Sequence, residues 1–270
     1  MSGSFFDLSG RVAIITGGTG MLGISHARAV HTAGGVPVLL DISVQNPEQL
    51  RDRAGFDVHY LTCDITHEDQ LFAALQVILE RYQRLDILIN NAANNPKVEA
   101  PGSLSNTRLE NFPLDHWNND LAVGLTGAML CSRVFGGEMA RRRKGVIVNI
   151  ASDLALIAPD QRLYAIEGRK EDEQPVKPVS YSVVKTGLIG LTRYLATYWA
   201  AAGVRANAIC PGGVENGQDP IFLQRIAERI PLGRMAAIDE YQGAILFLCS
   251  DASSYMTGAV LTVDGGRSAW

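Results

Sequence analysis

Residues Val12-Ala13-Ile14-Ile15-Thr16-Gly17-Gly18-Thr19-Gly20-Met21-Leu22-Gly23 decide the fold of this chain. The continuous apolar run, rich in β-branched side chains, predicts a strand that is buried on both faces of a parallel sheet. The glycines that follow allow a sharp turn into a helix and let backbone N–H groups approach a pyrophosphate at the positive helix end. A glycine-rich turn alone is often only a tight loop. Within a strand–turn–helix unit it indicates a dinucleotide site.

A second apolar strand, Val36–Leu40, ends in Asp41, at about the distance of 20 residues where dinucleotide-binding folds place an acidic side chain. A carboxylate there can accept hydrogen bonds from the adenosine ribose hydroxyls, and it repels a 2′-phosphate. Asp41 therefore predicts NAD rather than NADP as the cofactor. The alternative is that Asp41 is a helix cap or turn residue before Ser43.

Strand-like and helical segments alternate along the chain, with strands expected near Val12, Val36, Val58, Ile87, Val146, Val204 and Leu261. This alternation predicts an α/β fold, a doubly wound parallel sheet (Rossmann fold) of about seven strands with helices on both faces. We expect residues 1–270 to form a single dinucleotide-binding and catalytic domain. Three segments break the alternation after the carboxyl ends of strands, and they are expected to be substrate-site loops: 94–116, 153–178 and 212–235.

Several helices can be placed from capping and spacing. Thr66-His67-Glu68-Asp69 resembles a capping box and predicts a helix that runs to about Arg84. Long helices are expected over Trp117–Arg142 and Ser180–Ala202, and a shorter one around Phe222–Ile230.

The composition argues against several classes of function. The net charge is −4, and the only basic cluster, Arg141–Lys144, follows a predicted helix whose negative end it suits, so nucleic-acid binding is not expected. The four cysteines lie far apart and no histidine has a partner at metal-ligand spacing, so neither a metal nor a disulfide framework is predicted. Without a signal-like segment or a long apolar run, we expect a soluble cytoplasmic protein that does not bind membranes.

Tyr181 and Lys185 are the strongest candidates for chemistry. They are four residues apart, so on a helix they share one face, and they follow a strand that ends near Ser152. A phenol has a pKa of about 10, and a neighbouring cation favours its phenolate form and suits it to proton transfer. By spacing alone, such a pair is more often an ordinary pattern on a helix surface than a catalytic one.

With these residues in place, the chain resembles the short-chain dehydrogenase/reductase family over nearly its full length. The resemblance lies in an ordered set of motifs: Thr16–Gly23, Asp64, Asn90-Asn91-Ala92-Ala93, Ser152, Tyr181–Lys185, Pro211-Gly212 and Val263-Asp264-Gly265-Gly266.

The resemblance implies a role for each matching residue. Tyr181 would be the general acid/base, Lys185 would hold the nicotinamide ribose and lower the pKa of Tyr181, and Ser152 would bind the reacting oxygen. Asn90 would support the sheet, although turn chemistry alone could explain Asn90 and Asn91. The expected contacts of NAD are Gly17, Thr19, Gly20, Met21, Leu22, Gly23, Asp41, Ile42, Asp64, Ile65, Asn91, Ala92, Ala93, Tyr181, Lys185, Pro211, Gly212 and Val214.

Tyr164 competes with Tyr181 for the catalytic role. It lies 12 residues after Ser152, closer to the usual family spacing, but Gly168 stands where a lysine is required. Tyr181 keeps Lys185 and opens a regular amphipathic helix, which makes residues 161–178 an insertion at the mouth of the site.

Three departures from the family pattern stand out. Met21 occupies a position where many members of this size have glycine, so the geometry of the turn is in question. Gly124 replaces the asparagine that supports a water-linked proton relay to the lysine in many relatives, and a water molecule could take its place. Asn216 replaces a threonine that often contacts the cofactor.

The expected activity is hydride transfer between NAD(H) and a secondary alcohol or ketone of a small polar, sugar-like substrate. Gln161, Arg162, Asn216 and Gln218 offer hydrogen bonds to such a molecule, unless they only line a solvated loop surface. The alternatives are an NAD-binding sensor or scaffold with decayed catalysis, suggested by Gly124, and a nucleotide-sugar epimerase or dehydratase, suggested by the glycine spacing.

A narrower similarity links the chain to family members associated with nonulosonate sugar biosynthesis. It rests on Ala158-Pro159-Asp160-Gln161, the run Thr192–Val214 and the terminal Trp270. It implies a polyol, amino sugar or sugar phosphate as substrate. The broader family resemblance implies a homotetramer in which the two long helices pair across a two-fold axis.

Overall fold

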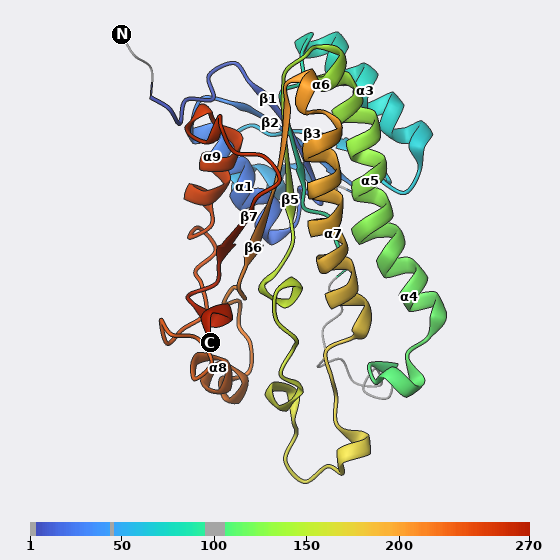
Figure 1. Ribbon diagram of the computed structural model, residues 1–270, viewed down its shortest axis with the longest axis vertical. Helices are drawn as coiled ribbons and strands as arrows, with labels where there is room; N and C mark the ends of the chain where they lie inside the picture. Colours follow the sequence, from blue (N-terminus) through green and yellow to red (C-terminus); the bar gives the residue numbers. More distant parts are fainter. Residues whose placement is uncertain (1–3, 44–45, 95–105) are drawn as a thin grey trace.

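The computed structural model describes residues 4–43, 46–94 and 106–270. At its centre, seven parallel strands lie in the order β3-β2-β1-β4-β5-β6-β7 (Figure 1). This is the doubly wound sheet that the sequence predicts. The strands are β1 (Val12–Thr16), β2 (Val36–Asp41), β3 (His59–Thr62), β4 (Ile87–Asn90), β5 (Gly145–Ile150), β6 (Val204–Pro211) and β7 (Val260–Val263).

Alternate side chains of each central strand enter two separate cores. Val12 and Ile14 of β1 pack into one core, whereas Ala13 and Ile15 pack into the other. Each core is closed by its own layer of helices, which is why the strands are apolar throughout. The first layer contains α3 (Glu68–Tyr82), α5 (Gly127–Cys131), α6 (Gly137–Arg141) and α7 (Val179–Tyr198), and the second contains α1 (Met21–Thr32), α2 (Pro47–Ala54) and α9 (Gln242–Cys249) (Figure 1).

The helix expected over Trp117–Arg142 is present but is not uniformly α-helical. It begins with α4 (Leu114–Leu121) and continues through two π-helical turns, Ala122–Thr126 and Ser132–Gly136, which separate α4, α5 and α6. Gly124 lies in the first π turn. Such turns widen a helix locally and often lie at functional sites, but apolar periodicity does not reveal them.

Three details differ from the sequence prediction. The prediction of a capping box at Thr66 is wrong. The N-cap of α3 is His67, and the Thr66 hydroxyl donates instead to Asp64 Oδ1 at 2.7 Å. The last expected helix begins earlier, at α8 (Pro220–Ala227), because Asp219 caps it and Pro220 occupies its first turn. The helix from Ser180 ends at Tyr198, and a short 3₁₀ turn, Ala200–Ala202, follows.

The strand order reverses between β1 and β4, and open α/β sheets bind ligands in the crevice at the carboxyl ends of such strands. The 153–178 and 212–235 segments extend beyond this end of the sheet (Figure 1). Of the expected 94–116 loop, residues 95–105 lie outside the described residues.

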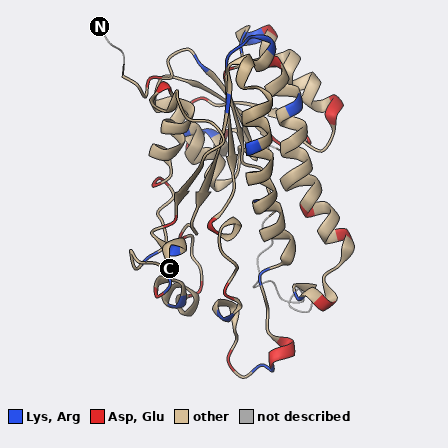
Figure 2. Ribbon diagram, in the orientation of Figure 1, with Lys and Arg blue, Asp and Glu red and all other residues tan. Residues whose placement is uncertain are grey.

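Charged residues mark the two ends of the molecule differently. The acidic run Glu171–Glu173 lies at the tip of the insertion, whereas the basic Arg141–Lys144 cluster lies at the opposite end (Figure 2). Arg141 and Arg142 both pair with Glu138 one turn earlier on the same helix, as expected for a basic helix end. None of the described helices has both the length and the apolar character needed to cross a membrane.

Candidate active site

The glycine-rich turn is held against the end of β4 at the switch point. Asn91 Nδ2 donates to the carbonyl oxygens of Thr16, at 3.0 Å, and Gly17, at 3.1 Å. Asn91 and Ala92 in turn donate their backbone N–H groups to Thr16 Oγ1, at 3.0 and 3.1 Å. Asn91 therefore has a specific role in positioning the turn, and it is not merely a turn residue.

Close approach requires glycine at three positions of this turn, Gly17, Gly18 and Gly23. Gly17 has φ +59°, and a Cβ there would lie 2.9 Å from Ala92 Cα. A Cβ at Gly23 would lie 2.4 Å from the carbonyl oxygen of Gly17. Met21 causes no such conflict, because it is simply the first residue of α1, and Gly20 before it is extended at φ −69°. The turn that the sequence predicts is therefore formed despite the unusual glycine spacing.

Asp41 lies at the end of β2, and its carboxylate faces this turn. Oδ2 accepts hydrogen bonds from Thr19 N at 3.0 Å and from Thr19 Oγ1 at 2.6 Å, while Oδ1 accepts from the backbone of Ile42 at 2.9 Å. Asp41 is not a helix cap, because α2 begins at Pro47 and Asn46 caps it. The carboxylate thus lies beside the start of α1, at the place where a ribose would reach it.

Several other expected cofactor residues lie at or after the carboxyl ends of β2, β3 and β6. Ile42 is exposed and Ile65 is buried beneath α5. Asp64 accepts hydrogen bonds from both the backbone and the hydroxyl of Thr66, which fix its carboxylate after β3. Pro211 ends β6 beside β7.

The segment after β6 is shaped by its own polar side chains. Gly212 lies so close to Asp264 that a Cβ would be 3.0 Å from its Cα. Val214 forms a β-bridge with Ala236. Gln218 accepts from the backbone of Asn216 at 2.7 Å and donates to the carbonyl of Val214 at 2.9 Å, so its side chain holds the loop together.

Beside this segment lies a cavity. Its volume is about 810 Å³, and it separates the start of α1 from the chain after β6. Met21, Ser25, Asn216 and Arg234 are among its lining residues. The glycine cradle, the amino end of α1 and the Asp41 carboxylate together fit a dinucleotide, with the pyrophosphate on the turn and a ribose beside Asp41.

A buried polar chain fixes the strands beneath the site. Asn90 Nδ2 donates to Asn149 Oδ1 at 2.8 Å and to Ser132 Oγ at 3.1 Å, and Asn149 Nδ2 donates to Thr192 Oγ1 at 2.7 Å. These bonds join β4, β5, the second π turn and α7. Asn90 therefore supports the sheet, as the family resemblance implies, and turn chemistry does not explain it.

Ser152, Tyr181 and Lys185 come together where β5 ends and α7 begins. The ammonium of Lys185 is buried, donates to the carbonyl of Ile150 at 2.8 Å and lies 5.8 Å from the centroid of the Tyr181 ring. Burial raises the pKa of Tyr181, and the hydrogen bond between its side chain and Ser152 opposes that shift. Burial lowers the pKa of Lys185 to about 8, with a smaller contribution from the charge of Lys177.

Sequence reasoning missed Asp153 and Arg267, which form an ion pair beside Ser152. Arg267 Nη1 lies 2.7 Å from Asp153 Oδ2, and the two side chains are only 10% and 4% exposed. The other oxygen of Asp153 accepts the Ser152 hydroxyl at 2.8 Å. An aspartate directly after Ser152 was a visible signal, but its partner near the carboxyl terminus was not.

Tyr164 lies near the same cluster, but its ring packs against α8. Its ring lies 5.8 Å from that of Phe222 on α8, in an apolar cluster with Leu163, Ile226 and Met235. Burial raises its pKa to about 12. Burial raises the pKa of Tyr181 as well, but only Tyr181 has Lys185 beside its ring and a hydrogen bond with Ser152, which favours Tyr181 as the acid/base.

The insertion is anchored from both sides of the site. Arg108 donates to the carbonyl of Glu171 at 2.9 Å, Arg225 of α8 donates to the carbonyl of Ala165 at 2.6 Å, and Arg229 pairs with Asp160 at 2.6 Å. The insertion thus connects the chain before α4 with α8 across the mouth of the site.

The polar loop residues considered for substrate binding already have hydrogen-bond or ion-pair partners within the loops. Gln161 accepts from the backbone of Lys177 at 2.8 Å, and Arg162 pairs with Asp160 in an exposed position. Together with Gln218, these side chains hold loops. The alternative of a loop surface therefore describes them better than substrate contact does.

Gly124 lines a small cavity behind Tyr181. The cavity measures about 10 Å³, and Asp120, Val184 and Lys185 also line it. About 10–15 Å³ is enough for one water molecule when polar partners are present. A Cβ on Gly124 would lie 2.5 Å from Val184 Cγ1, so the glycine also allows α7 to pack closely against the π turn.

The class of protein that this geometry defines is a dinucleotide-binding oxidoreductase, because a cofactor cradle and a proton-transfer cluster share one crevice. Comparisons agree with this class. Residues 11–165 match the family profile described as short chain dehydrogenase, and residues 170–268 match the one described as enoyl-(acyl carrier protein) reductase. The chain therefore belongs to the short-chain dehydrogenase/reductase family.

Individual relatives extend over nearly the whole chain. D-threitol dehydrogenase of Mycolicibacterium smegmatis is 31% identical, with 97% of this chain and 94% of the relative covered. Galactitol 2-dehydrogenase of Rhizobium johnstonii is also 31% identical, with 98% of each covered. The crystal structure of a gluconate 5-dehydrogenase from Burkholderia cenocepacia in complex with NADP and tartrate superimposes with a TM-score of 0.82, at 29% identity and 98% coverage of each chain.

Proposed function

We propose that this protein is an NAD-dependent dehydrogenase that transfers hydride between the cofactor and a secondary alcohol or ketone of a small polar, sugar-like substrate. The observation that carries the proposal is the Ser152, Tyr181 and Lys185 cluster beside a glycine-rich turn. The polyol and gluconate dehydrogenases among the similar proteins support the choice of an alcohol group on a hydroxylated molecule.

Side chains of the protein would transfer the proton of the substrate hydroxyl group. Tyr181 takes it from the alcohol during oxidation and returns it to the carbonyl oxygen during reduction. Lys185 favours the phenolate that the first of these steps requires. The Ser152 hydroxyl, which donates to Asp153 here, turns to donate to the reacting oxygen. The nicotinamide, when bound, supplies or accepts the hydride.

Asp41 is the basis for proposing NAD rather than NADP. Its carboxylate lies at the end of β2, hydrogen-bonded to Thr19, and a 2′-phosphate beside it would place like charges together. The similar gluconate 5-dehydrogenase was crystallised with NADP, so similarity alone does not fix the cofactor.

Asp41→Ala should lower the preference for NAD: the kcat/KM for NAD divided by the kcat/KM for NADP should fall by at least about tenfold. This corresponds to a change of about 1.4 kcal/mol in selectivity. Thr19→Val is the matched control, because it removes the hydroxyl that binds Asp41 and keeps the carboxylate. An unchanged ratio in Asp41→Ala would show that another residue selects the cofactor.

The function is tested by following NADH formation over a panel of polyols, aldonates, uronates, amino sugars and sugar phosphates. Turnover of at least one hydroxylated substrate, and its loss in Tyr181→Phe, is the expected result. Cofactor binding without turnover of any panel member would favour the NAD-binding sensor, the alternative that Gly124 suggests.

A nucleotide-sugar epimerase or dehydratase is the weaker alternative. The similar proteins named above include polyol and gluconate dehydrogenases, which supports simple alcohol oxidation instead. Testing nucleotide sugars in the same panel separates this activity from simple alcohol oxidation.

We also propose a cytoplasmic homotetramer of single-domain subunits. Exposed apolar side chains on the long helices support an interface there: Tyr194 and Tyr198 are 61% and 63% exposed, stack on each other, and share this layer with the exposed Met129. Light scattering at micromolar concentration should report a tetramer, and a monomer would contradict the proposal.

A further inference from the structure

Lys177 lies at the carboxyl-terminal end of the insertion, next to the candidate active site. It lies between Pro175 and Pro178, and Pro178 is the N-cap of α7. Its backbone N–H donates to Gln161 Oε1 at 2.8 Å. The neighbouring Val176 donates its N–H to Thr107 Oγ1 at 3.3 Å. The backbone that carries Lys177 is thus fixed by two prolines and by bonds to two other segments.

The side chain of Lys177 turns back over the ring of Tyr181. Its Nζ lies 3.9 Å from the ring centroid, closer than the 5.8 Å of Lys185 Nζ. Both ammonium groups lie within the distance of about 6 Å at which a cation is attracted to an aromatic ring. The ring of the proposed acid/base therefore contacts two cations, and the family pattern accounts for only one of them.

We infer that Lys177 is a positioning residue that favours the phenolate form of Tyr181 and so sets the pH range of proton transfer. This inference rests on the proposed function of Tyr181. A cation attracts a phenolate more strongly than a neutral phenol, and the attraction is greater where water is excluded. Burial and the charge of Asp153 both disfavour the phenolate, and the hydrogen bond with Ser152 favours it. We expect the ammonium over the ring face to add to the effect of Ser152.

Charged and titratable groups on several elements face this pair of lysines. Asp120 of α4 and Asp153 after β5 are carboxylates that favour the charged form of Lys177, against the burial that lowers its pKa to about 8. Facing Lys185 is Cys210 of β6. Tyr164 and Arg267 lie next to the Tyr181 and Asp153 pair. The two carboxylates therefore favour the charged form of Lys177, and a phenolate at Tyr181 would favour it further, because the two groups titrate as a coupled pair.

The direct test is a pH titration of Tyr181 by NMR of protein labelled with ¹³C in the tyrosine ring, with the signal assigned from Tyr181→Phe. Lys177→Met should raise the pKa of Tyr181 by about one pH unit, whereas Lys177→Arg should leave it near the wild-type value. Lys170→Met, an exposed lysine of the same insertion, is the matched control and should have no effect.

An unchanged pKa of Tyr181 in folded Lys177→Met would overturn the inference and leave Lys177 a packing role only. If Lys177→Met fails to fold by circular dichroism, Lys177→Gln provides the same neutralisation with a polar side chain. The acid limb of the kcat/KM profile should move by the same amount as the NMR titration. Because the titration needs no substrate, a failed substrate screen would count against the proposed function and not against the role of Lys177.

Discussion

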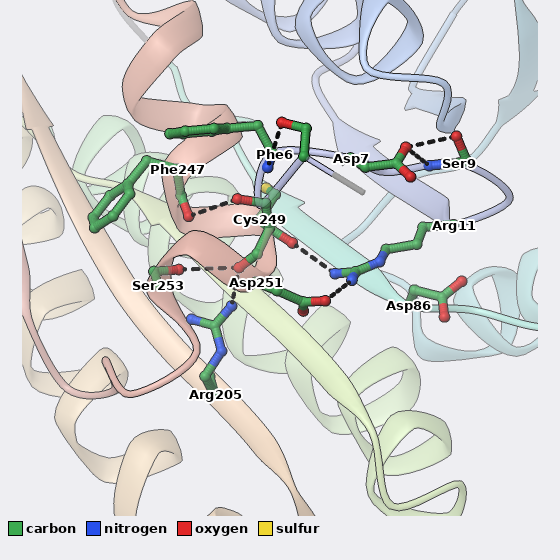
Figure 3. Close-up of polar contacts among 12 residues, drawn as sticks. Phe6, Asp7, Ser9, Arg11, Asp86, Arg205, Phe247, Cys249, Asp251 and Ser253 are labelled. Carbon is green, nitrogen blue, oxygen red and sulfur yellow. Dashed lines mark hydrogen bonds and ion pairs between the residues drawn. The ribbon is translucent and has the colours of Figure 1, made fainter. Parts of the chain in front are cut away.

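Partly or fully buried cations lie at both ends of the sheet, but the groups that stabilise these cations differ between the two ends. At the amino end, Arg205 donates to the carbonyls of Leu248, Ser250 and Met256 at 3.0–3.1 Å, and Arg11 pairs with Asp251 at 2.6 Å (Figure 3). At the carboxyl end, Lys185 donates to one carbonyl and lies beside the Tyr181 ring.

This difference shows at which end of the sheet the charge of a buried side chain can change with pH. An arginine stays charged even where burial lowers its pKa, as at Arg205, so it serves as a fixed structural link. A lysine with a pKa of about 8, such as Lys185, can change its charge near neutral pH. The amino end should therefore control stability and the carboxyl end activity.

Tyr181→Phe should have the largest effect on activity and little effect on stability. It removes only the hydroxyl that carries the proton, so kcat should fall by about 10³-fold, or roughly 4 kcal/mol in barrier height. NAD affinity by fluorescence and the melting temperature should stay near wild type. A rate within a few-fold of wild type would mean that Tyr181 is not the acid/base.

Arg205→Met should show the opposite pattern. It removes three charge-assisted hydrogen bonds, although Ser253 and Asn207 still donate to the same carbonyl groups, and this should lower the free energy of unfolding by about 2–4 kcal/mol. Urea denaturation gives the stability, and kcat of the folded fraction should be nearly unchanged. A large loss of kcat at full stability would remove the distinction between the two ends.

His26, on α1 between the two ends, should make stability depend on pH. It is 1% exposed, neither ring nitrogen has a hydrogen-bond partner among the described residues, and burial lowers its pKa from 6.5 to about 4. Between about pH 4 and pH 6.5, the imidazole of His26 is protonated in the unfolded chain but neutral in the folded chain. Above about pH 6.5, His26 therefore does not lower the free energy of unfolding. As the pH falls from 6.5 towards 4, the free energy of unfolding should decrease by about 3 kcal/mol in total because of His26.

His26→Leu should reduce this acid sensitivity in urea titrations at several pH values. His31→Gln, an exposed change on the same helix, is the control and should keep the wild-type slope. Equal slopes in wild type and His26→Leu would show that carboxylates alone account for the loss of stability in acid.

Gly124→Asn should have the smallest effect. If a water molecule in the adjacent cavity already links Lys185 to its surroundings, an added amide changes kcat by less than about tenfold, or 1.4 kcal/mol. Gly124→Ala is the matched control, because both variants bring a Cβ to within 2.5 Å of Val184 Cγ1 unless that side chain moves. A gain of several orders of magnitude in Gly124→Asn alone would show that the natural protein lacks a working relay.

Local patterns were enough to predict much of this structure. The apolar run of β1, the glycines after it and Asp41 after β2 predicted the sheet and the cofactor cradle, because strand burial and turn geometry depend on near neighbours. The helical spacing of Tyr181 and Lys185 likewise placed the two groups of the proposed catalytic pair on one face. The failures at the Thr66 cap and at the π turns arose where a competing hydrogen bond or the width of a helix decided the outcome.

By itself, then, the sequence determined the doubly wound fold, the switch point and the Tyr181 and Lys185 pair, since each depends on residues close together in the chain. Only the tertiary structure decided that Asp153 pairs with Arg267 and that Lys177 lies over the Tyr181 ring. The first joins segments more than a hundred residues apart. The second depends on how the insertion is braced against other loops, and no periodicity along the chain records either kind of contact.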